Sequence, residues 1–485
     1  MIIKNNIDEI QSYFFDAANY KGECSEVYFP ETPSDIQKII LAANSSKTRV
    51  TVSGNRTCLT GACVPEGGIV ISTEKLNHIL SWGENSVTVE PGVLLKDLQE
   101  NLEAKGFFFP PDPTERNCFL GGTIATNASG AKTLKYGSTR AFVEGLKLIL
   151  PDGDFLTLRR GEIFAEGNKI KFSTDTGRQI IIMLPDITMP ATKNTAGYYI
   201  NPSMDLIDLF IGSEGTLGII SEAALKLLPL PKNIISSVIF FHSITEALDF
   251  IMEVSTNSIK EVCASGLEFF DNYALEFLRY DYSNIPESAK AAVWFEQDDA
   301  ENLESSLNLW IELIEKHNGD INHSWVSTNE PDRNKFKDFR HTVSLKVNEY
   351  ISRKGFRKVG TDTAVPKINF LEFYNFISET AAKSGIDYLI YGHFGNFHPH
   401  LNLLPKSEGE FLRAKKIYRQ ICIKAVELKG TVSAEHGIGK MKHQYLIDMF
   451  GEEKIIAMAG IKKILDPNNI LGIGNIFNEK YLKQN

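Results

Sequence analysis

Four histidines and one glutamate gather in two short glycine-flanked segments of this sequence. His393, His398 and His400 occur in YGHFGNFHPHLN, and Glu435 directly precedes His436 in SAEHGIGK. Imidazole and carboxylate ligands without cysteine suit zinc or another borderline divalent ion with an open coordination position, as in catalytic metal sites. The chain has ten histidines, so this grouping favours a functional site over separate structural histidines. In an extended strand residues two apart share a face, so spacing alone pairs His398 with His400.

Three glycine-rich segments form a second set of candidates. They are VSGNRTCLTGACVP at 52–65, a block at 120–153 that contains GGTIATNASG, and a block at 209–229 that contains GSEGTLGII. Glycine allows positive φ and close approach of the backbone to a ligand, and successive N–H groups in such turns form a concavity that binds anions. Each block alone is typical of a tight turn, but together they indicate a large ligand with phosphate groups. Neither a P-loop nor a strand-borne G-x-G-x-x-G is present, which argues against a simple NAD domain.

Short alternating helices and strands must position these segments in the first half of the chain. Residues 33–46 place apolar residues on one helical face behind a Ser34 cap, and 48–54 is a β-branched strand that leads into the first glycine block. The prolines of LLPLPKN at 227–233 suggest a boundary, after which longer helical patterns alternate with strands. The sequence therefore predicts an α+β protein, and its 485 residues call for at least two domains.

Composition excludes several classes of function. The net charge of −10 disfavours nucleic acid and anionic bilayers as partners, and the basic residues at 334–347 are typical of a helix face. No run approaches the roughly 20 apolar residues of a membrane span, and the N-terminus has no signal-like apolar region. We expect a cytoplasmic protein without a transmembrane segment, able to dock peripherally at a membrane through a partner. The cysteines form no C-x-x-C and predict free thiols rather than an iron–sulfur cluster: Cys24, Cys58, Cys63, Cys118, Cys263 and Cys422.

The sequence resembles the flavin-dependent oxidoreductases of the vanillyl-alcohol oxidase type, in particular their D-2-hydroxy-acid dehydrogenase branch. That branch holds D-lactate dehydrogenases, the flavoprotein subunit of glycolate oxidase and D-2-hydroxyglutarate dehydrogenase. The likeness covers nearly the whole chain and follows one order of motifs: the loop at 53–65, PPDPTE, GGTIATNASG, YG, KNTAGY, GSEGTLGII, GHFGNFHPHLN, GTVSAEHGIGK and LDPNNIL. It implies a two-subdomain FAD-binding domain and an α+β substrate (cap) domain with an antiparallel sheet.

The resemblance implies FAD as the cofactor. The first loop would wrap the pyrophosphate, the second block would line the pyrophosphate and isoalloxazine ring, and the third would lie near adenine and ribose. Relatives with covalent flavin attach it through a loop histidine, and no histidine lies between 1 and 77, so we expect non-covalent FAD. The implied cofactor residues are Gly54, Asn55, Arg56, Thr57, Cys58, Gly61, Pro111, Gly121, Gly122, Thr123, Asn127, Ala128, Gly130, Tyr136, Gly137, Gly215, Thr216, Gly218 and Ile219.

The first loop departs from the glycine-rich pattern of the branch. Where relatives commonly have Gly-Thr-Gly, this chain has Arg56, Thr57 and Cys58. One interpretation of Arg56 is a solvated surface charge. The other is that its guanidinium supplements the backbone donors at the FAD phosphates.

The family pattern G-H-x-G-D-G-N-x-H-x-N implies His393 and His400 as metal ligands, with Glu435 as the third. His398 stands where relatives have Asn, and it remains a candidate substitute ligand or a neighbour of the ligands. The resemblance implies His436 as general base: it would take the hydroxyl proton of a 2-hydroxy acid while the C2 hydrogen leaves as hydride to flavin N5. A divalent ion, for which zinc is expected, would lower the pKa of the substrate hydroxyl.

Recognition of the substrate carboxylate calls for a cation. Arginine binds a planar carboxylate in two places at once, which lysine cannot do. Arg340, in FKDFRHTVSLKV, matches the substrate arginine of the family, although a surface helix charge is the alternative. Lys358 and Asn402 are weaker candidates.

These inferences predict an FAD- and metal-dependent dehydrogenase that oxidises a D-2-hydroxy acid to its 2-oxo acid. Electrons would pass to a quinone, a cytochrome or a partner protein instead of NAD, and a homodimer is left open. Residues 1–230 would bind FAD through two subdomains, 231–430 would form the substrate domain, and 431–485 would complete the active site. Two rivals are an enzyme like alkyl-dihydroxyacetone-phosphate synthase, whose relatives carry a run of histidines in place of SAEH, and a non-catalytic flavin subunit of a larger complex, which should lack the His/Glu group.

Overall fold

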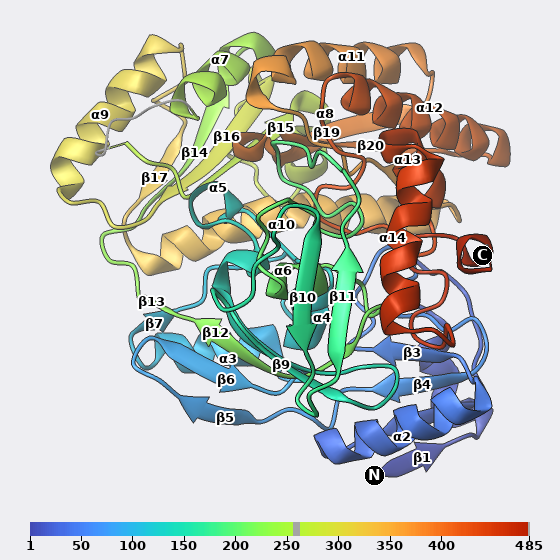
Figure 1. Ribbon diagram of the computed structural model, residues 1–485. Helices are drawn as coiled ribbons and strands as arrows, with labels where there is room; N and C mark the ends of the chain where they lie inside the picture. Colours follow the sequence, from blue (N-terminus) through green and yellow to red (C-terminus); the bar gives the residue numbers. More distant parts are fainter. Residues whose placement is uncertain (256–261, 484–485) are drawn as a thin grey trace.

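The computed structural model describes residues 1–255 and 262–483 and is an α+β fold built on three main sheets (Figure 1). Two smaller sheets of the first half occupy the lower part of the view, and one large antiparallel sheet of the second half occupies the upper part. Within the described ranges, no helix is both long and apolar enough to cross a membrane. The predicted fold class is confirmed.

The first sheet carries the opening glycine loop at the end of a parallel strand. Its order is β1 (Ile2–Lys4), β2 (Glu26–Phe29), β4 (Ile69–Ser72) and β3 (Val50–Ser53), with β2 and β3 each parallel to β4. Helix α2 (Pro33–Ser46) packs its buried isoleucines on this sheet. The short α1 (Ile7–Ile10) contributes Ile10 to a separate core with Val27, Phe29 and Val70. Strand β3 ends at Ser53, so the chain leaves the sheet directly into the loop that follows.

One sequence prediction about α2 is wrong. The helix is capped by Thr32, whose side chain accepts a hydrogen bond from the Asp35 N–H, and Ser34 lies inside the first turn. Pro33 explains the shift, because proline suits the first helical position, where its fixed φ fits and no N–H is needed. The cap therefore falls one residue before the proline.

The second sheet is antiparallel, in the order β5 (Ile79–Trp82), β6 (Ser86–Val89), β12 (Ile219–Lys226), β8 (Val143–Ile149) and β9 (Phe155–Arg159). Two separate two-stranded antiparallel sheets are also present: the hairpin of β10 (Lys169–Ser173) with β11 (Gln179–Met183), and the pair of β7 (Phe107–Phe108) with the distant β13 (Leu228–Pro229). The second glycine block contains β8 and the third contains β12, and in each block the glycine-rich motif leads toward the strand. The short helices of this part are α3 (Leu95–Glu103), α4 (Leu120–Ala125), α5 (Thr133–Tyr136) and α6 (Ile207–Phe210).

The third sheet has seven antiparallel strands and positions the histidines. Its order is β17 (Trp325–Ser327), β14 (Ile235–Phe241), β16 (Ala291–Gln297), β15 (Gly266–Asp271), β19 (Asp387–His393), β20 (His398–Leu404) and β18 (Val359–Gly360). Strands β14, β15 and β16 are buried along their full length, because helices cover both faces of the sheet.

Helices α8 (Asn272–Leu278) and α10 (Glu330–Arg353) cover one face of this sheet, and the apolar side of α10 packs on Phe270 and Trp294. The opposite face is covered by α7 (Ile244–Val254), α9 (Leu303–Lys316), α11 (Phe370–Lys383) and α12 (Glu408–Glu427). The chain then returns toward the first half through α13 (His443–Phe450) and α14 (Glu452–Leu465), which run down one side of the molecule in Figure 1.

Candidate active site

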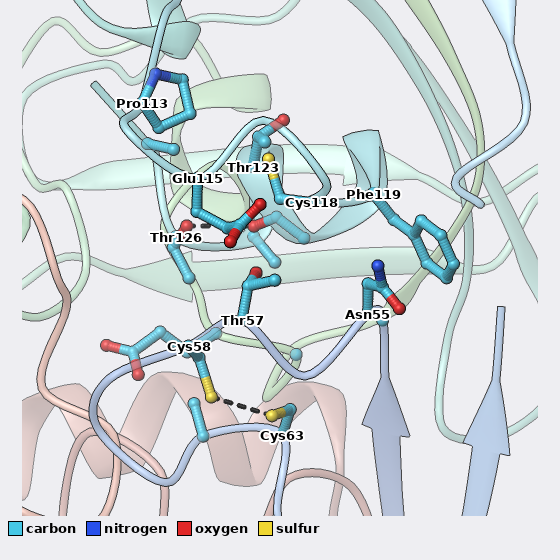
Figure 2. Close-up of a pocket in the computed structure, with 18 of the residues that line it drawn as sticks. Asn55, Thr57, Cys58, Cys63, Pro113, Glu115, Cys118, Phe119, Thr123 and Thr126 are labelled. Carbon is cyan, nitrogen blue, oxygen red and sulfur yellow. Dashed lines mark hydrogen bonds between the residues drawn. The ribbon is translucent and has the colours of Figure 1, made fainter. Parts of the chain in front are cut away.

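A cavity of about 550 Å³ runs among the three glycine-rich segments and reaches the histidine cluster. Figure 2 shows part of its lining, from the first glycine segment and from residues 113–126. Its wall includes His393, Glu435 and His436 at the cluster. The predicted cofactor residues that line it are Gly54, Asn55, Arg56, Thr57, Cys58, Gly121, Gly122, Thr123, Ala128, Gly130, Gly215, Gly218 and Ile219. The other predicted cofactor residues are not among the described residues that line the cavity: Gly61, Pro111, Asn127, Tyr136, Gly137 and Thr216.

The lining is shaped for a ligand that fills the space between the segments. A Cβ added at Gly122 would meet no described atom within 4 Å, so it would project into the cavity and take up its volume. Gly130 has the opposite reason to be glycine, since a Cβ there would lie 2.1 Å from the Asp112 carbonyl oxygen. Glycine at 122 therefore leaves the cavity volume free, and glycine at 130 lets the backbone pack directly against Asp112. These residues therefore fit an extended cofactor bound by backbone groups.

Arg56 does not point freely into solvent. Its guanidinium carbon lies 4.5 Å from the centre of the Tyr13 ring, a cation–π arrangement, and its backbone has φ of 59°. Its carbonyl oxygen accepts a hydrogen bond from the Ala17 N–H. Arg56 lines the cavity from this position, and its role at the FAD phosphates stays a prediction.

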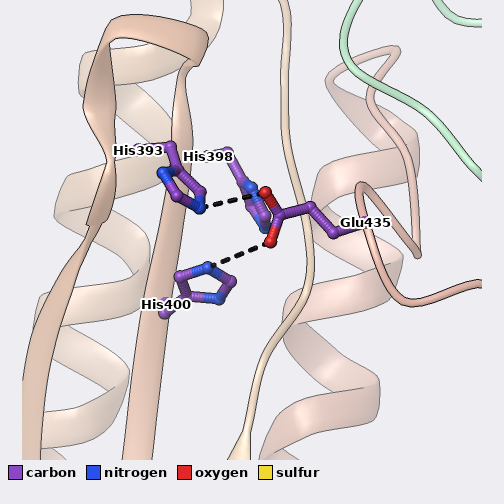
Figure 3. A group of neighbouring side chains, drawn as sticks. All are labelled: His393, His398, His400 and Glu435. Carbon is purple, nitrogen blue, oxygen red and sulfur yellow. Dashed lines mark ion pairs between the residues drawn. The ribbon is translucent and has the colours of Figure 1, made fainter. Parts of the chain in front are cut away.

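The three histidines and Glu435 converge on one point (Figure 3). Their candidate ligand atoms all lie within 4.8 Å of one another. The hairpin of β19 and β20 brings the histidines together, with His393 opposite His398 in register and Phe397 in a left-handed turn conformation at φ of 55°. His393 Nε2 lies 2.9 Å from Glu435 Oε1, and His400 Nε2 lies 3.9 Å from Glu435 Oε2. The structure thus groups His398 with the predicted ligands instead of separating it from them.

Hydrogen bonds behind the cluster orient its two outer histidines. His400 Nδ1 is 2.9 Å from the Thr361 carbonyl oxygen, which can only accept, so Nδ1 carries the proton and Nε2 is free to bind a metal. His393 Nδ1 is 2.9 Å from Glu268 Oε1 and leaves Nε2 facing Glu435 in the same way. Such outer partners are typical of metal-binding histidines. The donor set therefore fits a divalent ion.

His398 is completely buried, and its ring has fewer hydrogen bonds than those of His393 and His400. Its Nε2 lies 3.2 Å from Asp362 Oδ1, and neither ring nitrogen has a well-formed hydrogen bond to a described residue. Burial lowers its pKa to about 4, so the imidazole is neutral at pH 7. A neutral imidazole with a free lone pair is available as a ligand or as a neighbour of one.

Lys193, which sequence reasoning did not single out, contacts Glu435 directly. Its ammonium group pairs with Glu435 Oε1, and only 4% of its side chain is exposed. Burial opposes ionisation of Glu435, but His393 and Lys193 hold the pKa of this carboxyl well below its usual range. A signal was present, because Lys193 opens KNTAGY, one of the motifs that carry the family resemblance.

Asp362 is a second buried group that the sequence did not reveal. Its carboxylate lies 3.3 Å from His436 Nδ1, and it accepts the backbone N–H groups of Glu435 and His436, each at 3.1 Å. It also accepts a hydrogen bond of 2.7 Å from the Lys442 ammonium group. Burial disfavours the charge, yet His436 and Lys442 keep the pKa of Asp362 well below normal. Asp362 therefore fixes both the backbone and the ring of His436.

Arg340 lies in the interior, so the alternative of a surface charge is wrong. It is 6% exposed on α10, its Nε lies 2.8 Å from Glu268 Oε1, and its Nη2 has no hydrogen-bond partner among the described residues. A buried arginine N–H without a hydrogen-bond partner destabilises the folded protein unless a ligand accepts a hydrogen bond from it. One and two turns further along α10, Ser344 and Asn348 line the cavity, as the i, i+4, i+8 spacing could have shown.

Asn402 and Lys358, the two weaker candidates for substrate recognition, differ in their burial. Asn402 is buried on β20, and its Nδ2 donates to the His400 carbonyl oxygen at 3.3 Å. Lys358 is partly exposed just before β18 and is not among the described residues that line the cavity. Their roles stay predictions.

Known families account for most of the chain. The family "FAD linked oxidases, C-terminal domain" matches residues 230–476, and the family "FAD binding domain" matches residues 25–159. The cavity joins glycine segments within residues 25–159 to the histidine cluster within residues 230–476. The chain belongs to the FAD-linked oxidases and is an FAD-dependent oxidoreductase, as the resemblance predicted.

Several relatives match this chain over nearly its full length. Glycolate oxidase subunit GlcD of Bacillus subtilis is 31% identical over 475 residues, covering 96% of this chain and 92% of that protein. A D-lactate dehydrogenase of Anaerostipes hadrus is 29% identical, covering 97% and 93%, and a D-2-hydroxyglutarate dehydrogenase of Stutzerimonas stutzeri is 28% identical, covering 98% and 96%. A solved alkyldihydroxyacetonephosphate synthase shares the fold, with a TM-score of 0.69 at 15% identity, covering 97% and 81%.

Proposed function

We propose that this protein oxidises a D-2-hydroxy acid to the corresponding 2-oxo acid and passes the electrons to an acceptor other than NAD. The observation that carries the proposal is the connection from Arg340 through Glu268 to His393: one buried carboxylate holds both the candidate substrate arginine and a candidate metal ligand. A 2-hydroxy acid presents a carboxylate beside a hydroxyl, which matches an arginine beside a metal and a base.

The residues divide the chemistry among them. Arg340, one turn before Ser344, which lines the cavity, would offer its unpaired Nη2 to the substrate carboxylate. His393, His400 and Glu435 would hold a divalent ion, for which zinc is expected, with His398 as a further candidate ligand. When bound, the ion would supply Lewis-acid polarisation of the substrate hydroxyl, and FAD would supply the hydride acceptor. His436, oriented by Asp362, takes the hydroxyl proton at Nε2, since Nδ1 faces the Asp362 carboxylate.

The proposal also covers the binding of FAD, the roles of the domains, the substrate class and the electron acceptor. FAD is held without a covalent bond by residues 1–230, residues 231–430 form the substrate domain, and 431–485 complete the site. The relatives named for glycolate, D-lactate and D-2-hydroxyglutarate support a 2-hydroxy acid as the substrate class. One relative is named a cytochrome-linked D-lactate dehydrogenase and another an oxidase subunit, which supports a cytochrome or a partner protein as acceptor.

The test is a screen of D- and L-2-hydroxy acids with an artificial dye acceptor, with and without a chelator. We expect stereospecific dye reduction that the chelator abolishes. His436→Asn should retain the flavin spectrum and lose about 100-fold or more of kcat, whereas His242→Asn, a change at an exposed histidine, should have no effect. Equal rates for all acids would favour an alkyl-dihydroxyacetone-phosphate synthase-like enzyme or a non-catalytic flavin subunit. Full activity of His436→Asn would refute the assignment of the base.

A further inference from the structure

Two cysteines lie against each other in the first glycine segment. Cys58 Sγ and Cys63 Sγ are 2.8 Å apart, and Figure 2 shows them facing each other across the loop. Both line the cofactor cavity, both are partly exposed, and both are free thiols. A disulfide bond is about 2.05 Å long, so the two sulfurs need to approach by less than about 1 Å to bond.

The loop between the two cysteines is held from both sides. Asp16 Oδ2 accepts the Gly61 N–H at 2.8 Å and lies 3.4 Å from Cys58 Sγ. On the other side, the Thr60 carbonyl oxygen accepts the Lys440 N–H at 2.8 Å. These contacts keep the two sulfurs opposed while the thiols are reduced. Little rearrangement of the loop is therefore needed for a bond between them.

We propose that Cys58 and Cys63 form a reversible disulfide, and that this cross-link slows the loss of FAD. The oxidant is a small-molecule disulfide. The Cys63 thiolate attacks one of its sulfurs and releases the first small thiol, leaving a mixed disulfide on the protein. The sulfur of Cys58 then displaces the second small thiol. Two protein thiols become one disulfide, and one small disulfide becomes two thiols.

The order of the two cysteines follows from their surroundings. The contact with Cys63, which both thiols share, and burial raise the pKa of the Cys58 thiol. Cys58 Sγ also lies 3.4 Å from Asp16 Oδ2, and the negative charge of this carboxylate disfavours a thiolate at Cys58 and so raises the pKa of its thiol further. A thiol with a raised pKa forms little thiolate and is a weak first nucleophile. Cys58 therefore suits the second step, in which the mixed disulfide is already within reach of its sulfur.

The effect on FAD follows from the place of the loop. Residues 54–58 form part of the cavity wall, and the cross-link would tie them to the segment that ends at Cys63. A cross-link restricts the loop most when the cavity is empty, so it favours the bound arrangement by pre-organising it. The disulfide should therefore retain the cofactor better than the thiol pair does.

The first experiment treats the purified holoenzyme with oxidised glutathione until no further change occurs, blocks the remaining thiols and digests with trypsin. Cleavage after Arg56 and Lys75 yields one peptide in which these two are the only cysteines. We expect this peptide to be lighter by two hydrogen atoms and unblocked, and to recover both thiols with dithiothreitol. Cys263→Ser, at an exposed and separate cysteine, should behave like wild type. Cys58→Ser should instead keep a glutathione adduct on Cys63. Blocked thiols or glutathione adducts in the wild-type peptide would overturn the proposal.

The second experiment measures FAD release from the oxidised and reduced wild-type protein by flavin fluorescence after dilution, which needs no variant. We expect FAD release from the oxidised form to be at least about 3-fold slower, because the cross-linked loop gains less conformational entropy when FAD leaves the cavity. Equal release rates would overturn the effect on FAD, and faster release would reverse it.

Discussion

Substitution of Glu268 by Gln should destabilise the protein and weaken its metal site together. The carboxylate of Glu268 lies on β15, is 3% exposed, and pairs with Arg340 Nε at 2.8 Å and His393 Nδ1 at 2.9 Å through the same oxygen. Glutamine keeps the size and one carbonyl oxygen but removes the charge, so it imitates the protonated acid. Arg340 would then remain buried with Asp112, at 4.0 Å, as its nearest carboxylate.

The pKa of Glu268 gives the magnitude. Burial alone would raise it, but Arg340 and His393 lower it from 4.5 to about 2. At 1.36 kcal/mol for each pKa unit, this shift corresponds to about 3 kcal/mol in favour of the ionised form. Because the folded pKa is lower than the unfolded one, this stabilisation is present above about pH 4.5 and is lost as the pH falls toward 2. The difference in unfolding free energy between wild type and Glu268→Gln should therefore be largest above about pH 4.5 and shrink as the pH falls toward 2.

The assay compares thermal unfolding and zinc affinity with those of Glu276→Gln. Glu276 also pairs with an arginine, at 2.9 Å, but its side chain is 64% exposed, so its loss should cost less than about 1 kcal/mol. For Glu268→Gln we expect the unfolding temperature to fall by about 3 °C, because about 3 kcal/mol is spread over the unfolding entropy of 485 residues, and zinc affinity to fall about 10- to 100-fold. Two variants that behave alike at pH 7 would refute the reasoning.

Three further predictions follow from the site. Arg340→Lys should raise KM about 10-fold or more while flavin binding is kept, because lysine cannot replace the paired donors of guanidinium; an unchanged KM in steady-state kinetics would contradict this. His398→Asn should keep bound zinc, as measured by elemental analysis, whereas His400→Asn should lose it; the reverse order would make His398 the ligand. Arg56→Ala should weaken FAD less than about 5-fold by fluorescence titration, because the guanidinium stacks on Tyr13; a larger loss would place it at the phosphates.

Local patterns in the sequence were enough to predict part of the site. Glycine segments that enter or leave strands are recognisable from their composition, and the structure brings all three to one cavity. The histidine hairpin was predictable too, since His393 and His400 flank a turn of the kind that glycine and asparagine permit. The cap of α2 was missed by two residues because Pro33 outweighs the capping preference of Ser34.

The groups that orient the site could not be predicted in the same way. Glu268, Asp362 and Lys193 each come from a different segment, and the chain contains 61 acidic residues that look alike in sequence. What distinguishes these carboxylates is burial beside a histidine and a cation, which depends on the pairing of β15 with β19 and on the long connection that returns to β18. Pairings between distant strands leave no local pattern.

The loop that carries Glu435 and His436 shows why such distant groups matter. Three carboxylates or carbonyls from separate parts of the chain bind its backbone: Asp362 accepts N–H groups at its start, Glu214 accepts the N–H groups of Ile438 at 2.8 Å and Gly439 at 2.7 Å, and Thr60 accepts that of Lys440.

The glycines of this loop make those approaches possible. A Cβ at Gly437 would lie 2.8 Å from Glu214 Oε1, and one at Gly439 would lie 2.1 Å from the Thr60 carbonyl oxygen. Both glycines also have positive φ, of 74° and 50°. The loop is therefore anchored to the first and third glycine segments and to the chain beside the large sheet at once. This is how the candidate base is held in register with the cofactor cavity on one side and the histidine cluster on the other.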